Sequence, residues 1–327
     1  MPADQPRISV VIPTLGDGPA LSRVLGGLRA QALPAAELEV VIALDAAAGE
    51  AAVASVEAMV APLGRRATIV RPERPGASAN RNAGARAAKA PILAFCDDDT
   101  VPTPALAAEH LRWHESHPEP EVCVLGLVRW APELDVTVFM RWLDRGVQFD
   151  YPFITGVEAG WGRFFSANVS CKREFFDAVG GFDEERFPFG YEDLDFGLRA
   201  DRAGMRLLYN RWAISDHLRE GVTPEFWRRR VRRIAAAEHR FCTVHPEIEP
   251  WFKRMFEHAL TRPPAQGRGR ALARWIGPDV PWLGTKVWTS TDLHFKQLLA
   301  PDFLAAWAEA EGEDGGAGGP DLRERRR

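Results

Sequence analysis

The stretch PILAFCDDDT, residues 91–100, decides how this chain folds and where its chemistry lies. Its apolar first half predicts a short buried strand, and three aspartates follow at the end of that strand. Carboxylates crowded there repel one another and resist desolvation, and a divalent cation is the usual compensation. In extended backbone Asp97 and Asp99 point to one side and Asp98 to the other. Asp97 and Asp99 are therefore candidate metal ligands, with a solvated acidic turn as the alternative.

The residues before this stretch alternate between apolar runs and helical patterns. Strands are expected at residues 7–14, 38–44, 67–70 and 91–95, and a fifth at 122–128, with helices between them. This alternation predicts an α/β fold with a Rossmann-like, mostly parallel sheet flanked by helices. Ligands bind at the carboxyl ends of strands in such sheets. Thr14, Asp45 and the three aspartates all follow strand ends, so they should converge on one rim.

The pattern changes after residue 130. Residues 131–162 are irregular and rich in aromatic side chains, a strand is expected at 163–170, and a helix at 191–203 opens with acidic residues. Acids in a first helical turn suit the helix dipole, which is the structural explanation for them. We expect a first domain at 1–221, divided into halves at 130, and a helical extension at 222–310. Residues 311–327 are rich in glycine and charge, which predicts a disordered tail.

Composition excludes several classes of protein. The formal net charge of −4 argues against binding to nucleic acid. No apolar run reaches the roughly 20 residues that a bilayer span requires, and the first residues lack a signal-peptide pattern. The four cysteines form no CxxC pair and are expected to be reduced thiols. These features predict a cytoplasmic protein.

An ordered series of motifs then becomes recognisable. It runs through IPT (12–14), Asp45, RPGASANRNAG (74–84), FCDDDT (95–100), SANVS (166–170), GGFDE (180–184) and GYEDLDFGLRA (190–200). The series covers roughly residues 7 to 217 and resembles the inverting family 2 glycosyltransferases of the GT-A fold. The resemblance implies transfer of a hexose or deoxyhexose from a nucleotide-diphosphate sugar to a hydroxyl group. The first half-domain would bind the donor and the second would bind the acceptor and carry catalysis.

The resemblance also assigns the catalytic roles. Asp193 would be the general base that takes the proton of the attacking hydroxyl, supported by Glu192. Mn²⁺ or Mg²⁺ would be held by the DxD aspartates Asp97 and Asp99, with His217 completing the metal shell as in some metal-dependent relatives. A lone histidine is as often structural, and the acids can coexist with helix capping.

Contacts with the two substrates follow by the same similarity. Pro13, Thr14 and Asp45 match positions that hold the base and ribose, Asp98 would help with the ribose, and Arg81 would contact the nucleotide. A UDP-sugar or dTDP-sugar is expected, with a GDP-sugar as a further option. Relatives usually continue IPT with an aromatic residue and Asn, whereas this chain continues with LGDG (15–18), which leaves the base open. Trp161 and Asn168 are candidate acceptor contacts, with core packing as the alternative for Trp161.

The acceptor class and the role of the last third stay open. A surface polysaccharide, a glycolipid or a glycosylated metabolite would each fit. The arginine-rich segment Phe226–Arg240 has three interpretations: a solvated face over an apolar stripe, peripheral contact with the inner face of a membrane, or contact with the pyrophosphate of a lipid-linked acceptor. The helical third can be read as an acceptor lid or as a homo-oligomer interface.

Two other function classes compete with this interpretation. A sugar-phosphate nucleotidyltransferase would carry Arg and Lys directly after the first strand, and residues 15–20 contain neither. A catalytically degenerate member acting as a nucleotide-sugar-binding or scaffold subunit is the non-enzymatic alternative. The intact acidic residues and His217 favour an enzyme.

Overall fold

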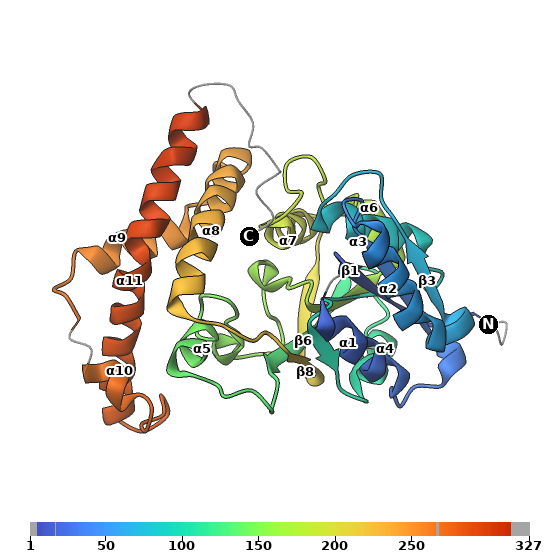
Figure 1. The fold of residues 1–327 in the computed structure, drawn as a ribbon, viewed down its shortest axis with the longest axis horizontal. Helices are drawn as coiled ribbons and strands as arrows, with labels where there is room; N and C mark the ends of the chain where they lie inside the picture. Colours follow the sequence, from blue (N-terminus) through green and yellow to red (C-terminus); the bar gives the residue numbers. More distant parts are fainter. Residues whose placement is uncertain (1–4, 17, 266–267, 315–327) are drawn as a thin grey trace. The chain divides into compact units, whose positions relative to one another are not determined.

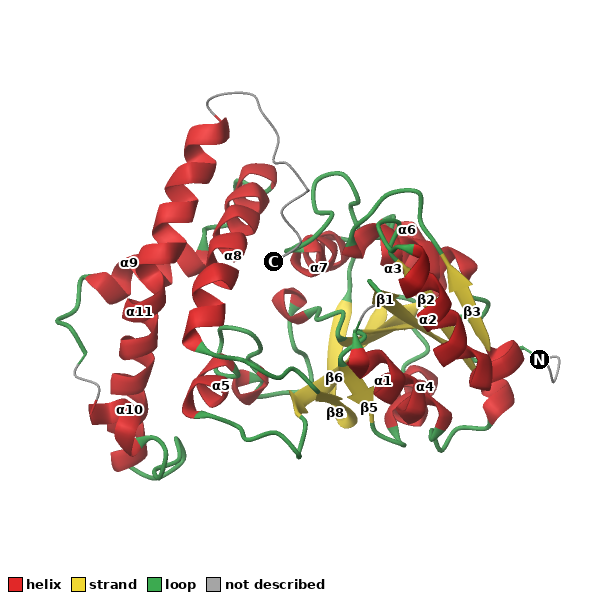
Figure 2. Cartoon of the chain, in the orientation of Figure 1, coloured by secondary structure: helices red, strands yellow, loops and turns green. Residues whose placement is uncertain are grey.

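The computed structural model describes residues 5–16, 18–265 and 268–314 (Figures 1 and 2). They divide into two compact units, each described here by itself. The first comprises Met1–Asp135 and Gln148–Glu220, and the second comprises Val136–Val147 and Gly221–Arg327. The segment Val136–Val147, expected in the first domain, therefore groups with the C-terminal helices.

A single sheet organises the first unit. Within the described residues it has eight strands in the order β3-β2-β1-β4-β7-β6-β8-β5. The strands are β1 (Ile8–Thr14), β2 (Leu38–Leu44), β3 (Ala67–Val70), β4 (Ile92–Cys96), β5 (Thr100–Pro102), β6 (Val122–Trp130), β7 (Asn168–Lys172) and β8 (Arg206–His217). The β1–β4 and β1–β2–β3 pairs are parallel, whereas β7 runs antiparallel to both β4 and β6. This confirms the α/β fold predicted from the alternating pattern.

Helices cover both faces of this sheet (Figure 2). Alternation along β1 sends Ile8, Val10 and Ile12 into one apolar cluster and Val11 into another. The first cluster includes side chains of α1, α2 and α4, and the second includes side chains of α3, α6 and α7. These helices are α1 (Pro19–Arg29), α2 (Glu50–Val60), α3 (Ala77–Ala87), α4 (Leu106–Ser116), α6 (Arg173–Val179) and α7 (Glu192–Arg202).

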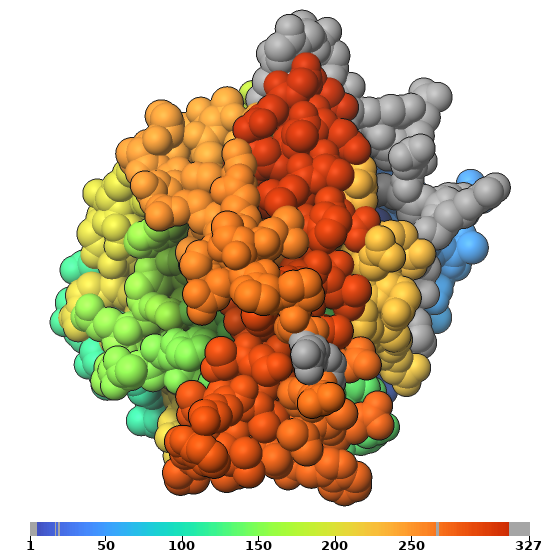
Figure 3. Space-filling view, turned by 90° about the vertical axis from the view of Figure 1, so that its left-hand side faces the viewer, coloured from blue at the N-terminus to red at the C-terminus, as the bar shows by residue number. Residues whose placement is uncertain are grey.

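The second unit consists of helices, as the sequence pattern predicted. They are α5 (Val138–Leu143), α8 (Pro224–Val244), α9 (Trp251–Leu260), α10 (Arg268–Leu272) and α11 (Leu283–Asp314). The long α11 runs the length of the face in Figure 3, with α8, α9 and α10 beside it. Aromatic rings of Phe139 and Trp142 pack against Phe295 at 5.0 and 5.2 Å, which explains why α5 belongs to this unit. Of the predicted tail, residues 311–314 continue α11, and the rest lies outside the described residues.

The arginines of α8 are engaged within this unit. Arg228 pairs with Asp302 of α11 at 2.6 Å, and Arg232 pairs with Glu309 of α11 at 2.6 Å. Trp227, Val231 and Phe241 of the same helix are buried. The segment Phe226–Arg240 therefore packs its apolar stripe inward, while at least two of its charges are compensated by α11.

The close approach of α3 to β1 gives a test of the packing. A Cβ atom at Gly84 would lie 2.3 Å from Cγ1 of buried Val11. Gly84→Ala should therefore destabilise the first unit by about 1–3 kcal/mol through overpacking. Gly26 of α1 has nothing within 4 Å of the equivalent position, so Gly26→Ala should instead be neutral or stabilising by about 0.5–1 kcal/mol. Denaturant melts of both variants measure this, and equal effects would contradict the packing.

Candidate active site

The predicted rim forms because β2, β1 and β4 are adjacent and parallel, so their carboxyl ends meet at one edge. Thr14 at the end of β1 donates from Oγ1 to Oδ2 of Asp98 at 2.5 Å. The backbone N–H of Gly16 in turn donates to Oγ1 of Thr14 at 3.0 Å. The residues assigned to the base and ribose are thus joined across neighbouring strands. Pro13 lies beside them in β1.

Asp45 organises the loop that follows β3. This residue is 1% exposed, and its Oδ2 accepts hydrogen bonds from the Gly76 N–H at 2.8 Å and from Nδ2 of Asn80 at 3.0 Å. Its Oδ1 accepts a third from the Ala47 N–H at 2.8 Å. A carboxylate with three such donors fixes the backbone around it. Asp45 therefore holds the start of α3, and with it Arg81, in place.

Arg81 joins the two halves of the first unit. This guanidinium is 5% exposed and donates to Oδ1 of Asp97 at 2.9 Å and to Oε1 of Glu192 at 3.0 Å. Burial alone would lower the pKa of Arg81, but Asp97, Asp193 and Glu192 together raise it above its ordinary value. Arg81 is expected to touch the nucleotide, and in the structure two of its nitrogens donate to carboxylates.

Asp193 has one carboxylate oxygen held by the backbone and one buried without a hydrogen-bond partner among the described residues. Its Oδ2 accepts a hydrogen bond from the backbone N–H of Ser166 at 3.0 Å. Its Oδ1 is buried and has no hydrogen-bond partner among the described residues. Burial raises the pKa of Asp193 to about 7; the nearby Arg81 opposes this rise and Glu192 adds to it. The carboxyl group can therefore gain or lose a proton near neutral pH.

Asp99 and His217 come together as the metal interpretation requires. Nε2 of His217 lies 3.3 Å from Oδ2 of Asp99, and its ring stacks on Trp130 with centroids 5.1 Å apart. The pairing follows from register, since Thr100 of β5 lies opposite His217 of β8. Arg219 also approaches Asp99, at 3.6 Å.

The third expected ligand, Asp97, lies against Arg81. Within the described ranges, no three side chains of His, Cys, Asp or Glu lie close enough together to form a complete metal-binding group. An oxygen and an imidazole nitrogen nevertheless suit Mn²⁺. Asp99 and His217 thus fit the ion as a pair of ligands.

The two candidate acceptor residues have different surroundings. Asn168 is 1% exposed, and its Nδ2 donates to the carbonyl oxygens of Leu127 and Ala213 at 3.1 and 2.8 Å. Its Oδ1 lies 2.9 Å from Nε2 of His110. The structure does not support an acceptor contact by Asn168, because burial and internal hydrogen bonds occupy its amide. Trp161 is partly buried against the core of the unit.

Several features at the site were not anticipated from the sequence. Tyr191, directly before the acidic pair, has a φ of 65°, a left-handed conformation that is unfavourable for a bulky residue. His110 and His114 form a buried chain with Ser170, in which burial lowers the pKa of His110 to about 4 and that of His114 to about 2. The glycine before Tyr191 was the one available signal for a strained turn.

The described residues contain no helix that is both long and apolar enough to cross a bilayer.

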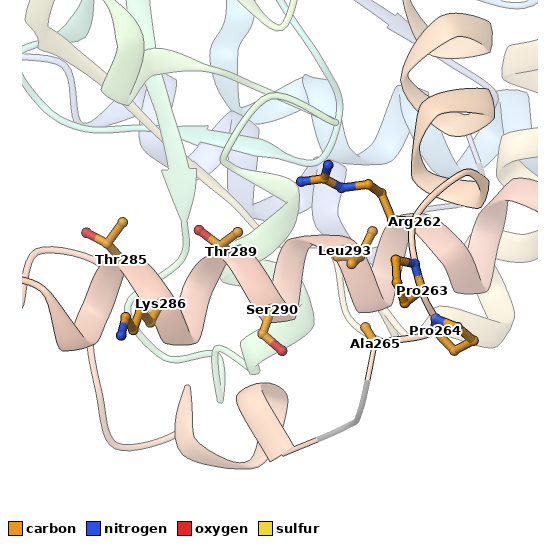
Figure 4. Close-up of a pocket in the computed structure, with 9 residues that line it drawn as sticks. All are labelled: Arg262, Pro263, Pro264, Ala265, Thr285, Lys286, Thr289, Ser290 and Leu293. Carbon is orange, nitrogen blue, oxygen red and sulfur yellow. The ribbon is translucent and has the colours of Figure 1, made fainter.

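The helical unit holds a pocket of about 510 Å³ between α11 and the segment after α9 (Figure 4). It is lined by Arg262, Pro263, Pro264, Ala265, Thr285, Lys286, Thr289, Ser290 and Leu293. None of the carboxylates described above belongs to it.

Comparison with known families accounts for the arrangement of the first unit. Residues 9–150 match the family described as Glycosyl transferase family 2, and residues 155–224 match the N-terminal domain of galactosyltransferase. Residues 9–150 carry a glycosyl transferase family 2 domain. The matched region contains the rim residues, Arg81, the acidic pair and His217, as the motif series implied.

Named relatives of this chain include two glycosyltransferases. It is 28% identical over 281 residues to a validoxylamine A glucosyltransferase of Streptomyces hygroscopicus subsp. jinggangensis, covering 75% of this chain and 62% of the relative. It is 26% identical over 255 residues to the uncharacterized glycosyltransferase YfnE of Bacillus subtilis, covering 64% of each. The chain thus spans about three fifths of the length of the Streptomyces relatives that it matches.

Solved structures share the fold at low identity. The mannosyltransferase PcManGT of Pyrobaculum calidifontis, solved with GDP-Man and Mn²⁺, superposes with a TM-score of 0.53 at 17% identity, covering 97% of this chain and 77% of that one. S. aureus TarS 1–349 with UDP-GlcNAc gives 0.52 at 16% identity, covering 94% and 92%. These similarities establish the GT-A fold.

The role of Asp45 as an organiser can be tested without any ligand. Asp45→Asn removes one acceptor from a buried group that satisfies three donors, so it should destabilise the first unit by about 1–3 kcal/mol. Asp135→Asn, at an exposed position, is the matched control and should leave stability unchanged. Thermal and denaturant melts measure both. Equal stability of the two variants would contradict the organising role.

Proposed function

We propose that this chain is an inverting glycosyltransferase that moves a hexose or deoxyhexose from a nucleotide-diphosphate sugar to an acceptor hydroxyl, with Asp193 as the general base. The supporting observation is the state of the Asp193 carboxyl group. One oxygen is fixed by the Ser166 N–H, the other is buried without a partner, and burial raises the pKa to about 7. A general base works best when its pKa lies near the operating pH.

Helix capping alone explains this carboxyl group less well. A capping carboxylate accepts from backbone N–H groups of its own first turn, whereas Asp193 accepts from Ser166 in a distant segment. In the proposed step, Oδ1 of Asp193 takes the proton of the acceptor hydroxyl while the oxygen of that hydroxyl bonds to the anomeric carbon of the donor sugar. The bond from that carbon to the diphosphate breaks on the opposite face, which inverts the configuration. Glu192 acts through Arg81 as a positioning residue.

The donor would bind along the rim. Thr14 and Asp98 lie at the ends of the adjacent strands β1 and β4, where nucleotides bind in such folds, and Asp45 fixes the backbone beside them. A UDP-sugar or dTDP-sugar is proposed, with a GDP-sugar as a further option. One solved neighbour holds GDP-Man and another holds UDP-GlcNAc, so the fold is compatible with more than one base.

A divalent cation, Mn²⁺ or Mg²⁺, would be held by Asp99 and His217, with Asp97 available once Arg81 releases it. Such an ion would stabilise the charge that develops on the leaving diphosphate. The carboxylates at 97–99 and 192–193 outnumber the buried guanidinium of Arg81, and an excess of negative charge favours cation binding.

The named Streptomyces relative acts on validoxylamine A, which supports a glycosylated metabolite as acceptor alongside a surface polysaccharide or glycolipid.

Asp193→Asn separates catalysis from folding. Asn cannot accept the hydroxyl proton, so turnover should fall by about 10²–10⁴-fold. Because the folded state raises the pKa of Asp193 from 3.8 to about 7, stability is lost between about pH 4 and pH 7 and the full cost is present at pH 8; Asn removes that cost. The melting temperature at pH 8 should therefore stay constant or rise. Wild-type turnover should increase with pH up to about 7 and then level. Full activity of Asp193→Asn would exclude the base assignment.

Nucleotide binding tests the donor site and the metal pair together. A ligand that binds only the folded state raises the melting temperature. One of UDP, dTDP, GDP or CMP should do so in the presence of Mn²⁺, and Asp99→Ala should abolish the metal-dependent part of the shift. Asp135→Ala is the control and should retain it. No shift with any nucleotide would favour a degenerate scaffold subunit.

A further inference from the structure

An unusual concentration of exposed apolar side chains marks residues 268–286, which comprise α10 and the turn into α11. The segment lies at the N-terminal end of α11 (Figures 1 and 3). Trp275 is 87% exposed and Trp282 is 70% exposed. Leu272, Val280 and Leu283 are exposed beside them in sequence. Large apolar residues gathered in this way indicate an interaction site; these five residues are called the tryptophan patch below.

The segment that carries the tryptophan patch is firmly attached to α11. Nε1 of Trp288 donates to the Ile276 carbonyl oxygen at 2.8 Å. A Cβ atom at Gly284 would lie 2.5 Å from the Gly277 carbonyl oxygen, and one at Gly269 would lie 2.5 Å from Oγ of Ser290. Such close packing and the internal hydrogen bond fix the backbone. The exposed tryptophans are therefore a feature of an ordered turn.

The conformation of Trp282 adds an independent observation. Its φ is 59°, in the left-handed region that a bulky side chain rarely adopts. Strained residues of this kind are associated with functional sites. The side chain gains little internal packing in return, since it is largely exposed and its ring is contacted by Nζ of Lys286 at 4.2 Å. The strain thus serves to present an indole outward.

Basic residues accompany the tryptophan patch in sequence. Residues 268–286 carry Arg268, Arg270, Arg274 and Lys286, all exposed, against one acid, Asp279. The whole chain has a net charge of −4, so this segment contrasts with the rest. Tryptophan and basic side chains together are typical of surfaces that lie on anionic lipid bilayers, where the indole enters the interface and the cations meet phosphate groups.

We propose that the tryptophan patch docks this chain on an anionic lipid surface. A symmetric contact between two copies is disfavoured, because it would bring the same cationic rim face to face with itself. The segment Phe226–Arg240 is less suited to this role, since Arg228 and Arg232 are paired with acids of α11. The docking is independent of the sugar-transfer chemistry, so either proposal can fail without the other.

The test is flotation of the full chain with vesicles. Wild type should float with phosphatidylcholine vesicles that contain phosphatidylglycerol, less so at high salt because salt screens surface charge, and little with phosphatidylcholine alone. Trp275→Ser/Trp282→Ser should lower the floated fraction by about tenfold, as expected from loss of two interfacial side chains. Trp212→Ser is the matched control, because Trp212 is 61% exposed and also lies against a cation, Arg211.

Further variants separate docking from folding. Trp282→Gly should lower the floated fraction by less than the double variant while keeping the wild-type melting temperature, since glycine adopts positive φ without strain. Arg268→Gln/Arg274→Gln should weaken binding to anionic vesicles only. The proposal is overturned if wild type does not float, if Trp212→Ser loses as much binding as the double variant, or if Trp282→Gly floats like wild type. It is equally overturned if the double variant abolishes self-association instead of vesicle binding.

Discussion

The buried guanidinium of Arg81 is the charge on which the rim of the first unit depends. It is 5% exposed, and it ties Asp97 at the end of β4 to Glu192 at the start of α7. Removing one partner from a buried charge cluster commonly costs about 3–5 kcal/mol, because the remaining charge stays desolvated. Asp45 supports this arrangement by accepting hydrogen bonds from Gly76 and Asn80, which fixes the start of α3, the helix that carries Arg81. The donor rim and the acidic pair are thus one electrostatic assembly.

This assembly explains why Asp193 differs from its neighbour. Arg81 donates directly to Glu192 and Asp97, whereas Asp193 lies near the guanidinium without a direct hydrogen bond to it. Two carboxylates therefore receive most of the compensation, and the third is left with burial and a nearby negative charge. Environment, not residue type, raises the pKa of Asp193. The same principle separates acid and base roles in many enzymes.

Much of the first unit could be predicted because its determinants are local. Short apolar runs ending in polar residues located β1, β2 and β4 closely, and the convergence of Thr14, Asp45 and the aspartates followed from parallel strands. The antiparallel β7 could not be predicted in the same way. It starts at Asn168, five residues after the beginning of the expected strand at 163–170, and its direction depends on pairing with β4 and β6, which leaves no signal within the segment.

The remaining surprises share one physical origin, which is long-range packing. Asn168 sits in a polar sequence context suited to substrate contact, yet its partners His110, Leu127 and Ala213 are distant in sequence. Val136–Val147 joins the helical unit because aromatic side chains meet across more than a hundred residues. The pairing of Asp97 with Arg81 could not be predicted either, because it depends on how α3 packs beside the end of β4.

The most direct test of the account is a carbon-13 titration of the Asp193 side-chain carboxyl, assigned by comparison with Asp193→Asn. The account predicts a pKa of about 7 in the folded protein. It also predicts a further rise in Arg81→Met, because the guanidinium opposes the effect of burial. A pKa near the ordinary value of about 4 for an aspartate, unchanged in Arg81→Met, would contradict it.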